Sequence, residues 1–339
     1  MSPRKIEDSK NALTSTQTNP RRYSADRRRF TMYISWNYPA EAGADVADFD
    51  NRFITVLEAR RQAWPRLESL RGTDQGIAPQ MDHGIVDAFS PFRKSMEELT
   101  GHAVPLLQRV DKQENNQLLD ERVLADTDTL MLISLDHQRT RQTITDAEVE
   151  VLKQFLAREG TCLMLHPHHD VGKADDLKGR VVEQRHHGDW TVSGQQRFSG
   201  FARSVLSALD IPVENQHGLS PGKVKGTNQP APLNIAADLD AKGLLRGVTT
   251  FNLHYHLPHY ALTTNDPKGA VVLARQPINL DAPPHPFIEA GNREFNAMIW
   301  IPPAGDRAGD ILVSDFTLLS GVFGGAASLE LFWRNLAKM

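Results

Sequence analysis

The sequence predicts an α/β fold: a doubly wound, mainly parallel flavodoxin-like sheet with helices on both faces and a β-rich C-terminal portion. Two observations predict this class. The centre of the chain follows the pattern strand, helix, strand with short connections, which is a βαβ unit. The last third of the chain is rich in strand patterns and ends in an amphipathic helix.

The central unit runs from residue 128 to residue 166. Its first strand, "DTLMLISL" (128–135), is nearly all apolar, as expected of a strand covered on both faces. Thr145, with Glu148 three residues later, forms a capping box that begins a helix, and Gly160 ends it. The second strand, "TCLMLH", covers residues 161–166. We expect the two strands to be parallel with a right-handed crossover.

Apolar periodicity and turn residues predict the remaining elements. Strands are expected at 30–38, 248–253, 269–275, 294–301 and 310–319. Helices are expected at 51–71, near 92–100, near 114–125, around 197–209 and over the last twelve residues. Pro65 should kink or split the first of these helices, and residues 72–91 have the Gly, Pro and Asp content of a loop.

We expect one domain preceded by a tail. Residues 1–29 carry many Arg and Lys side chains and almost no apolar ones, which predicts a disordered basic tail. Residues 30–339 are expected to form a single domain with an excursion around 173–247, where Pro, Gly and Asn accumulate from residue 212 onward. No separate linker interrupts this region.

Composition narrows the class of protein. The formal net charge of −4 gives no reason to expect a nucleic-acid partner. No apolar run reaches membrane-spanning length, so we expect no membrane association and a cytoplasmic protein. Cys162 is the single cysteine, which excludes internal disulfides and cysteine-rich zinc sites. Oligomeric state and any partner of the tail are not predicted.

Two segments carry a family resemblance. "TDAEVEVLKQFLAREGTCLML", after a strand opened by Asp128, and the later "GDILVSDFTLLSG" followed by a helix resemble the class I glutamine amidotransferase-like superfamily. The similarity is to its non-amidotransferase branches, of the trehalose-utilisation and gliding-associated type. The resemblance implies the flavodoxin-like fold given above.

The resemblance also implies where a nucleophile would stand. In working amidotransferases the strand ends in a Gly-x-Cys-x-Gly turn, whose cysteine attacks glutamine. Here the turn is His166-Pro167-His168-His169-Asp170, with the nucleophile position near His168 and no flanking glycines. Cys162 lies inside the strand, where burial should keep its thiol unreactive. We therefore expect the fold without glutamine hydrolysis.

The same turn supplies the candidate catalytic and metal-binding residues. Open parallel sheets bind ligands at the carboxyl ends of their strands, so His168, His169 and Asp170 are candidate catalytic residues. Histidines two apart in extended backbone point to one side, and imidazole with carboxylate suits a divalent metal such as zinc, iron or copper. The candidate metal ligands are His166, His168, His254 and His256.

Candidate substrate-binding residues come from two other strand ends. Trp36, Asn37 and Tyr38 close the first strand, and Asp136 and His137 close the strand before the His-rich turn. In a doubly wound sheet these ends face the same cleft. We expect the side chains to contact a small polar substrate.

Several functions remain open at this stage. The first is an enzyme, with metal-assisted or general-base chemistry of hydrolase, lyase or oxidative type. The second is a non-catalytic protein that binds a ligand or partner in the same cleft, and a residual amidohydrolase using Cys162 ranks last. The histidine spacing matches no defined metal motif, so a polar loop is the rival explanation of residues 166–170.

Overall fold

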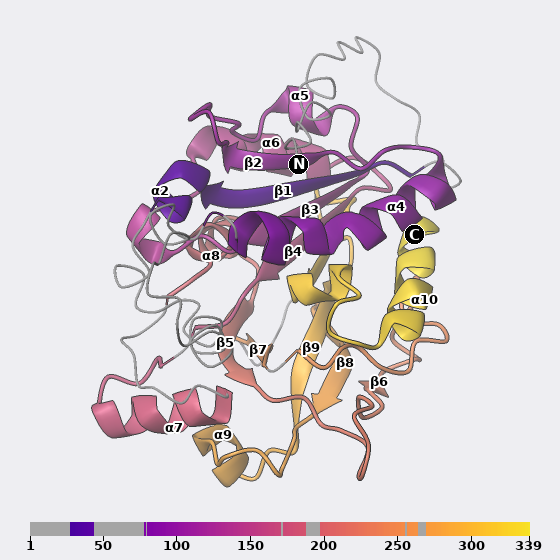
Figure 1. Ribbon diagram of the computed structural model, residues 1–339. Helices are drawn as coiled ribbons and strands as arrows, with labels where there is room; N and C mark the ends of the chain where they lie inside the picture. Colours follow the sequence, from indigo (N-terminus) through magenta and orange to yellow (C-terminus); the bar gives the residue numbers. More distant parts are fainter. Residues whose placement is uncertain are drawn as a thin grey trace.

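A computed structural model describes residues 28–43, 78, 80–170, 172–187, 197–254, 256–263 and 269–339. Within these residues an eight-stranded sheet has the order β2-β1-β3-β4-β10-β9-β8-β6, and β5 and β7 pair separately (Figure 1). The predicted mixed α/β fold is confirmed. No helix in this part of the chain combines the length and the apolar character needed to cross a bilayer.

The sheet has a parallel half and an antiparallel half. The parallel strands are β2 (Leu106–Val110), β1 (Phe30–Asn37), β3 (Thr129–Ser134), β4 (Cys162–Pro167) and β10 (Asp310–Ser314). The antiparallel strands are β9 (Glu294–Ile301), β8 (Val271–Pro277) and β6 (Asn234–Ile235). The two-stranded ribbon consists of β5 (Val213–Leu219) and β7 (Leu257–Leu262).

The central βαβ unit is as the sequence predicts. Helix α6 (Asp146–Leu156) joins β3 to β4, and these strands are parallel with Thr129 opposite Cys162. Both hydrogen bonds of the Thr145–Glu148 capping box are present. Glu148 also forms a buried ion pair with Arg109 of β2, which ties the start of α6 to the edge of the sheet.

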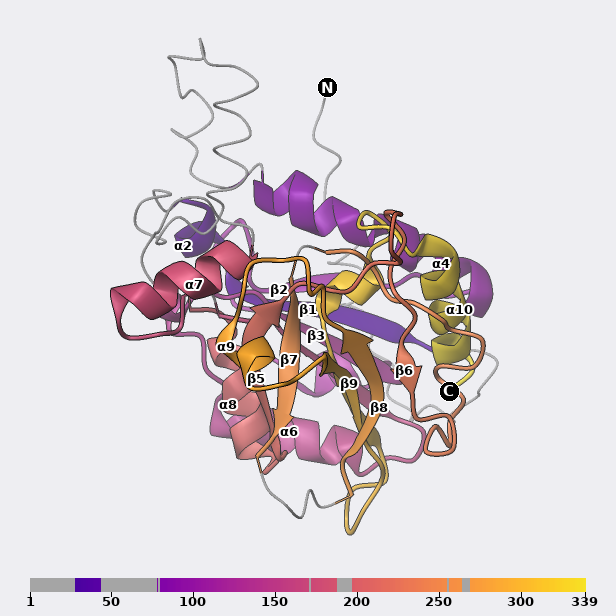
Figure 2. The same ribbon diagram turned by 90° about the horizontal axis from the view of Figure 1, so that it is seen from below.

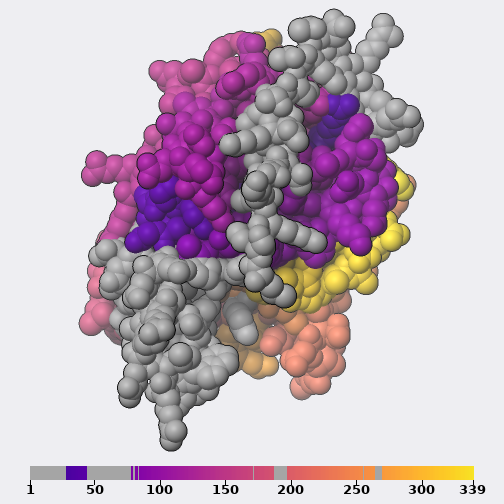
Figure 3. Space-filling view, turned by 45° about the horizontal axis from the view of Figure 1, so that its top comes forward, coloured from indigo at the N-terminus to yellow at the C-terminus, as the bar shows by residue number. Residues whose placement is uncertain are grey.

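Helices cover both faces of the parallel strands. On one face lie α4 (Ser90–Thr100) and α10 (Ala326–Ala337), and on the other lie α6 and α8 (Gly200–Ala208) (Figure 2). Side chains alternate along each strand, so Met164 points to α4 and α10 whereas Leu163 and Leu165 point to α6 and α8. Figure 3 shows the surface of α4 beside the C-terminal segment, drawn in yellow.

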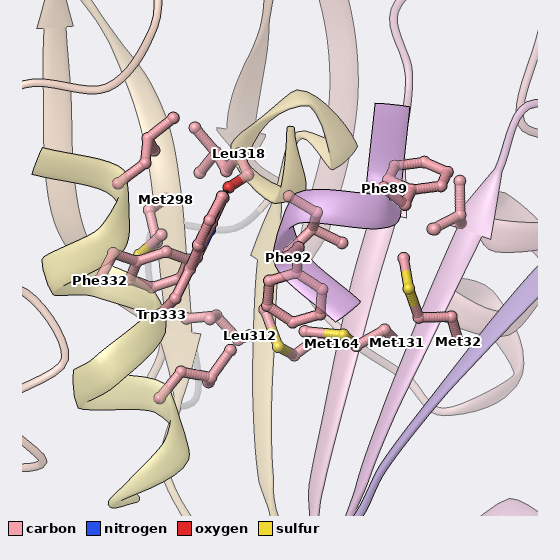
Figure 4. Packing of buried hydrophobic residues seen from close by; sticks show 14 of the residues in the cluster. Met32, Phe89, Phe92, Met131, Met164, Met298, Leu312, Leu318, Phe332 and Trp333 are labelled. Atoms are coloured by element: carbon pink, nitrogen blue, oxygen red, sulfur yellow. The ribbon is translucent and has the colours of Figure 1, made fainter. Parts of the chain in front are cut away.

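The α4–α10 face contains the larger apolar cluster. Figure 4 shows Phe92 of α4 and Trp333 of α10 above the methionines of the strands. The two rings meet edge to face with centroids 5.5 Å apart, a favoured aromatic geometry. The Trp333 indole N–H donates to the Leu318 carbonyl at 2.8 Å, so this side chain is buried without an unsatisfied polar group.

Smaller elements join these layers. They are the short helices α2 (Tyr38–Ala42), α5 (Glu121–Leu124) and α9 (Pro286–Glu289), the longer α7 (Leu177–His187), the π-helix η2 (Gln80–Val86), and the 3₁₀ helices η3 (Asp87–Phe89), η4 (Gln138–Thr140) and η5 (Phe316–Leu319). The helix predicted at 51–71 lies outside the described residues. Part of the loop predicted at 72–91 is helical, as η2 and η3.

One predicted helix begins later than expected, for a local reason. The helix expected near 114–125 begins only at Glu121, because Asp120 caps it by accepting the Val123 N–H at 3.1 Å. The preceding residues instead lie along β2, where the Gln117 N–H donates to the Arg109 carbonyl at 2.8 Å. Strand β2 itself was not predicted.

The C-terminal third also differs from the prediction in places. Residues 248–253 form no strand, and β7 begins later, at Leu257. The strand expected over 310–319 stops at Ser314, because the Asp315 carboxylate accepts the Thr317 N–H at 2.8 Å and begins η5. The final helix has the predicted buried face, with Leu329, Phe332, Trp333 and Leu336 inward.

The described part of the domain begins at Arg28, two residues before its predicted start at residue 30. Residues 1–27 lie outside the described part, but Arg28 is 1% exposed. Its guanidinium donates to the Thr129 hydroxyl at 2.5 Å and to the Met339 carbonyl at 3.0 Å. A buried arginine needs such partners, and these join the start of the domain to β3 and to the end of α10.

Phe92→Ala should lower the free energy of unfolding by about 3–5 kcal/mol, because it leaves a cavity between α4 and the sheet. The measurement is urea denaturation followed by circular dichroism. Leu99→Ala on the same helix is the control, since Leu99 is 42% exposed and should change stability by less than about 0.5 kcal/mol. Equal effects of the two substitutions would contradict the packing described for α4.

Candidate metal centre

Three histidines meet at the carboxyl edge of the parallel strands. His168 and His169 follow β4, and His256 precedes β7. One ring nitrogen from each lies within 4.8 Å of the other two, and this is the single such group of three metal-ligating side chains found among the described residues. The ring centroids of His169 and His256 are 4.4 Å apart.

The backbone of the turn is held on several sides. The Pro167 carbonyl accepts the Tyr260 hydroxyl at 3.0 Å, and the His168 N–H donates to the Ser199 hydroxyl at 2.7 Å. The Asn215 side-chain amide donates to the His168 carbonyl. Because the partners come from β7, the start of α8 and β5, the positions of the two histidines depend on all three elements.

A carboxylate just after β10 orients His168. The His168 Nδ1 donates to Asp315 Oδ2 at 3.0 Å, and Asp315 is 3% exposed. Burial acts to raise the pKa of Asp315, but the charge and hydrogen bond of His168, with the charge of His254, outweigh it and hold that pKa below its usual value. Asp315 is therefore an anion beside the three histidines.

The ring of His169 is fixed by a glycine. Its Nδ1 donates to the Asp170 carbonyl at 3.1 Å. The ring packs against the backbone of Gly218 in β5, where an added Cβ would lie 2.8 Å from Nδ1 and 2.9 Å from two ring carbons. The register of β5 shifts at this point, as expected of a bulge beside a functional site.

His256 is positioned by an irregular segment that packs on the glycine-rich loop before α10. The Leu253 N–H donates to the Phe323 carbonyl at 2.9 Å. Gly325 allows the closest approach, since a Cβ there would lie 1.9 Å from the Phe251 carbonyl oxygen. Within the same segment, the His254 Nδ1 donates to the His256 carbonyl at 2.5 Å.

The donor set fits a divalent metal. The Nδ1 atoms of His168 and His169 donate to oxygen acceptors, which leaves each Nε2 as the nitrogen able to bind a cation. Such outer hydrogen bonds are usual for metal-binding histidines. Three nitrogens bound to a tetrahedral ion at about 2.0–2.1 Å would lie about 3.3 Å from one another. The three ring nitrogens here lie within 4.8 Å of one another, so metal binding would draw the rings closer together.

His166 and Asp170, also predicted at this site, face other partners. His166 is fully buried, donates from Nδ1 to the Ser314 carbonyl at 3.0 Å, and burial lowers its pKa to about 4. The Asp170 carboxylate pairs with Arg203 at 2.9 Å and accepts the Phe198 N–H at 3.1 Å. These contacts anchor the two ends of the turn.

Asp136 and His137 support neighbouring backbone. The Asp136 carboxylate is fully buried, where burial raises its pKa, and it accepts the Phe201 N–H at 3.0 Å near the start of α8. His137 accepts the Arg139 N–H on Nδ1 at 3.1 Å and begins η4. The His137 ring also meets the edge of Phe198, with centroids 5.7 Å apart.

The end of β1 likewise makes structural contacts. Trp36 is fully buried in the core cluster on the α4–α10 face. The Asn37 side chain caps α2 by accepting the Ala40 N–H at 3.2 Å. The Tyr38 ring packs under the Lys112 ammonium, 4.9 Å from its centroid. Cys162 behaves as expected, since burial raises the pKa of its thiol to about 12.

Two residues of the centre were not predicted from the sequence. Asp315 had a visible signal, an acidic residue that interrupts the apolar run 310–319. Gly218 had none, because a glycine that touches a distant ring looks like any other glycine in a loop-rich region. His169 was predicted as a catalytic residue and not as a metal ligand, and the structure places it with His168 and His256.

A separate cavity of about 240 Å³ lies at the opposite edge of the sheet, by the amino ends of β1 and β2. Its charged rim residues are already paired, Arg29 with Asp126 and Arg122 with Asp120. None of the histidines of the metal centre lines it. Among the described residues, three metal-ligating side chains come together at the histidines and not at this cavity.

Comparisons with known proteins assign the chain to no family. No protein-family model matches it, and no curated protein sequence matches it. One solved structure, described as "mmIFT52 N-terminal domain", is similar over 68% of this chain and 82% of its own length, at 11% identity and a TM-score of 0.37. A likeness at this level assigns neither a family nor a function.

Gly218→Ala should destabilise the fold by about 1–3 kcal/mol, because the added methyl group overpacks against the His169 ring. Adding His169→Ala removes the clash, so the double variant should be more stable than the sum of the two single effects. Urea denaturation of the four proteins measures this coupling. Strictly additive effects would show that the glycine does not contact the histidine. Gly321→Ala is the matched control, because a Cβ at that position would have only the Ala326 Cβ nearby, at 3.9 Å.

Proposed function

We propose that this protein is a metal-dependent enzyme, a hydrolase or lyase that acts on a small polar metabolite, with His168, His169 and His256 as the metal ligands. The observation that carries the proposal is the convergence of three histidine nitrogens within 4.8 Å. Structural zinc sites are usually closed by four protein ligands, whereas catalytic sites have three and keep one position open. A set of three histidines therefore favours catalysis.

The surrounding residues suit this role. Asp315 holds the His168 ring in one orientation through Nδ1, and such a partner raises the basicity of the other ring nitrogen. Three neutral imidazoles bring no charge to a divalent ion, and the Asp315 anion lies one hydrogen bond away, behind His168. A bound ion of this kind polarises a carbonyl or phosphoryl oxygen and activates water, which favours substrates carrying those groups.

The fold proposal is a doubly wound, flavodoxin-like arrangement in a thiol-less branch of the class I glutamine amidotransferase-like superfamily. Two observations support it. Numbered along the chain, the five parallel strands have the order 2-1-3-4-5, which is the flavodoxin-like order. Cys162 is fully buried at the start of β4, while histidines occupy the turn where that superfamily has its nucleophile.

Untagged protein should bind one Zn²⁺ or Co²⁺ per chain in isothermal titration calorimetry. His168→Ala, His169→Ala and His256→Ala should each weaken binding by more than about 100-fold, since loss of an outer partner alone costs about 10–100-fold. His102→Ala is the control and should bind as the parent does. Stoichiometric binding that survives all three substitutions would place the ion elsewhere, and no binding would overturn the proposal.

The zinc-loaded chain should hydrolyse 4-nitrophenyl acetate, an activated ester, faster than the metal-free chain. The hydrolysis rate should rise as the pH passes through about 7, where zinc-bound water loses a proton. His168→Ala should reduce the rate to the metal-free level. Tight zinc binding without any gain in hydrolysis would contradict the hydrolase reading of the proposal.

A further inference from the structure

Four other histidines form a second group on the far side of β5. They are His186 in α7, His217 in β5, His259 in β7 and His285 just before α9. The ring of His285 lies 5.1 Å from that of His186 and 4.9 Å from that of His217, measured between centroids. The ring of His217 also stacks on that of His259, with centroids 6.4 Å apart, whereas the next residue, Gly218, lies against His169.

Three of these rings accept a hydrogen bond from backbone. His186 Nε2 accepts the Ser220 N–H at 3.1 Å. His259 Nδ1 accepts the Asn296 N–H at 3.2 Å, and His285 Nδ1 accepts the Phe287 N–H at 3.1 Å. A nitrogen that accepts a hydrogen bond carries no proton, so each ring is neutral and protonating it means breaking that bond.

These hydrogen bonds join separate elements. His186 connects α7 to the residue after β5, and its Nδ1 also donates to the Pro283 carbonyl near α9 at 2.6 Å. His259 connects β7 to β9, and His285 caps the start of α9. Figures 1 and 2 both show α7 and α9 side by side at one end of the molecule.

Taken together, the charged side chains near the four histidines do not stabilise protonated rings. The groups that face His217 are Lys173, Glu214 and His186, and Glu214 already pairs with Lys173 at 3.5 Å. His285 faces His217 and His186, and His259 faces His217. Burial lowers the pKa of His217 and His259 to about 4 and that of His285 to about 3. Neighbouring histidines, and Lys173 at His217, act in the same direction, whereas Glu214 raises the pKa of His217.

We propose that His186, His217, His259 and His285 form an acid-sensitive latch, which holds α7 and α9 against β5 and β7 while the rings are neutral and releases them when the rings are protonated. The pH window follows from the sign of the shifts. In the closed state the pKa values of His217, His259 and His285 lie below their ordinary value of 6.5, so the latch is complete above about 6.5 and weakens as the pH falls toward 4.

Hydrogen exchange of the full chain without added metal tests the latch. Protection factors for α7 and α9, corrected for intrinsic exchange, should fall steeply between pH 7.5 and pH 5. A histidine with a pKa of about 4 in the closed state and 6.5 in the open state favours opening about 25-fold more at pH 5 than at pH 7.5. Helix α6, which contains no histidine, is the internal reference and should keep its protection. Unchanged protection of α7 and α9 at pH 5 would overturn the latch.

Substitutions that keep the acceptor but cannot be protonated sharpen the test. Asparagine places an oxygen near the position of Nδ1 and glutamine near that of Nε2, which gives His259→Asn, His285→Asn and His186→Gln. The triple variant should lose most of the pH effect and keep only the shift of about 25-fold that His217 alone produces. If it does not fold, His285→Asn alone keeps a favoured helix cap and should reduce the pH effect about 25-fold or more. A variant that folds and retains the full pH dependence would overturn the proposal, and His102→Asn is the control.

Discussion

Strands β4 and β10 pair in parallel from Cys162 opposite Asp310 to Leu165 opposite Val313, and much of the structure depends on this pairing. It joins the central βαβ unit to a strand from the end of the chain. It also brings Asp315, the residue after β10, beside the turn that follows β4. Strand β9 then pairs antiparallel with β10, so the same strand divides the parallel half of the sheet from the antiparallel half.

Local signals predicted the elements that are determined locally. Thr145 and Glu148 are three residues apart and bond to each other, so the start of α6 is visible in the sequence alone. The apolar runs of β3 and β4 are visible for a similar reason, because burial on both faces removes the polar alternation. Strand β2 was missed because it is short and its pairing partners lie elsewhere in the chain.

The candidate site could be predicted only in part. The His-rich turn after β4 was visible as a break in an apolar run, and its place at the carboxyl edge followed from the parallel strands. Which histidines meet was not visible, because His168 contacts Asp315 across 147 residues and His256 arrives on an irregular segment. The predicted partners His166 and Asp170 instead bond to Ser314 and to Arg203, contacts that no local spacing encodes.

The carboxylate of Asp315 has two acceptor oxygens with separate partners. Oδ1 accepts the Thr317 N–H at 2.8 Å, and Oδ2 accepts from His168 Nδ1 at 3.0 Å. Asparagine has one oxygen, so an amide that still began η5 would turn its NH₂ group toward His168. The ring would then accept on Nδ1 and carry its proton on Nε2, the nitrogen that a metal needs. An Asp315→Asn substitution would therefore move the proton of the His168 ring from Nδ1 to Nε2, although the two residues follow different strands.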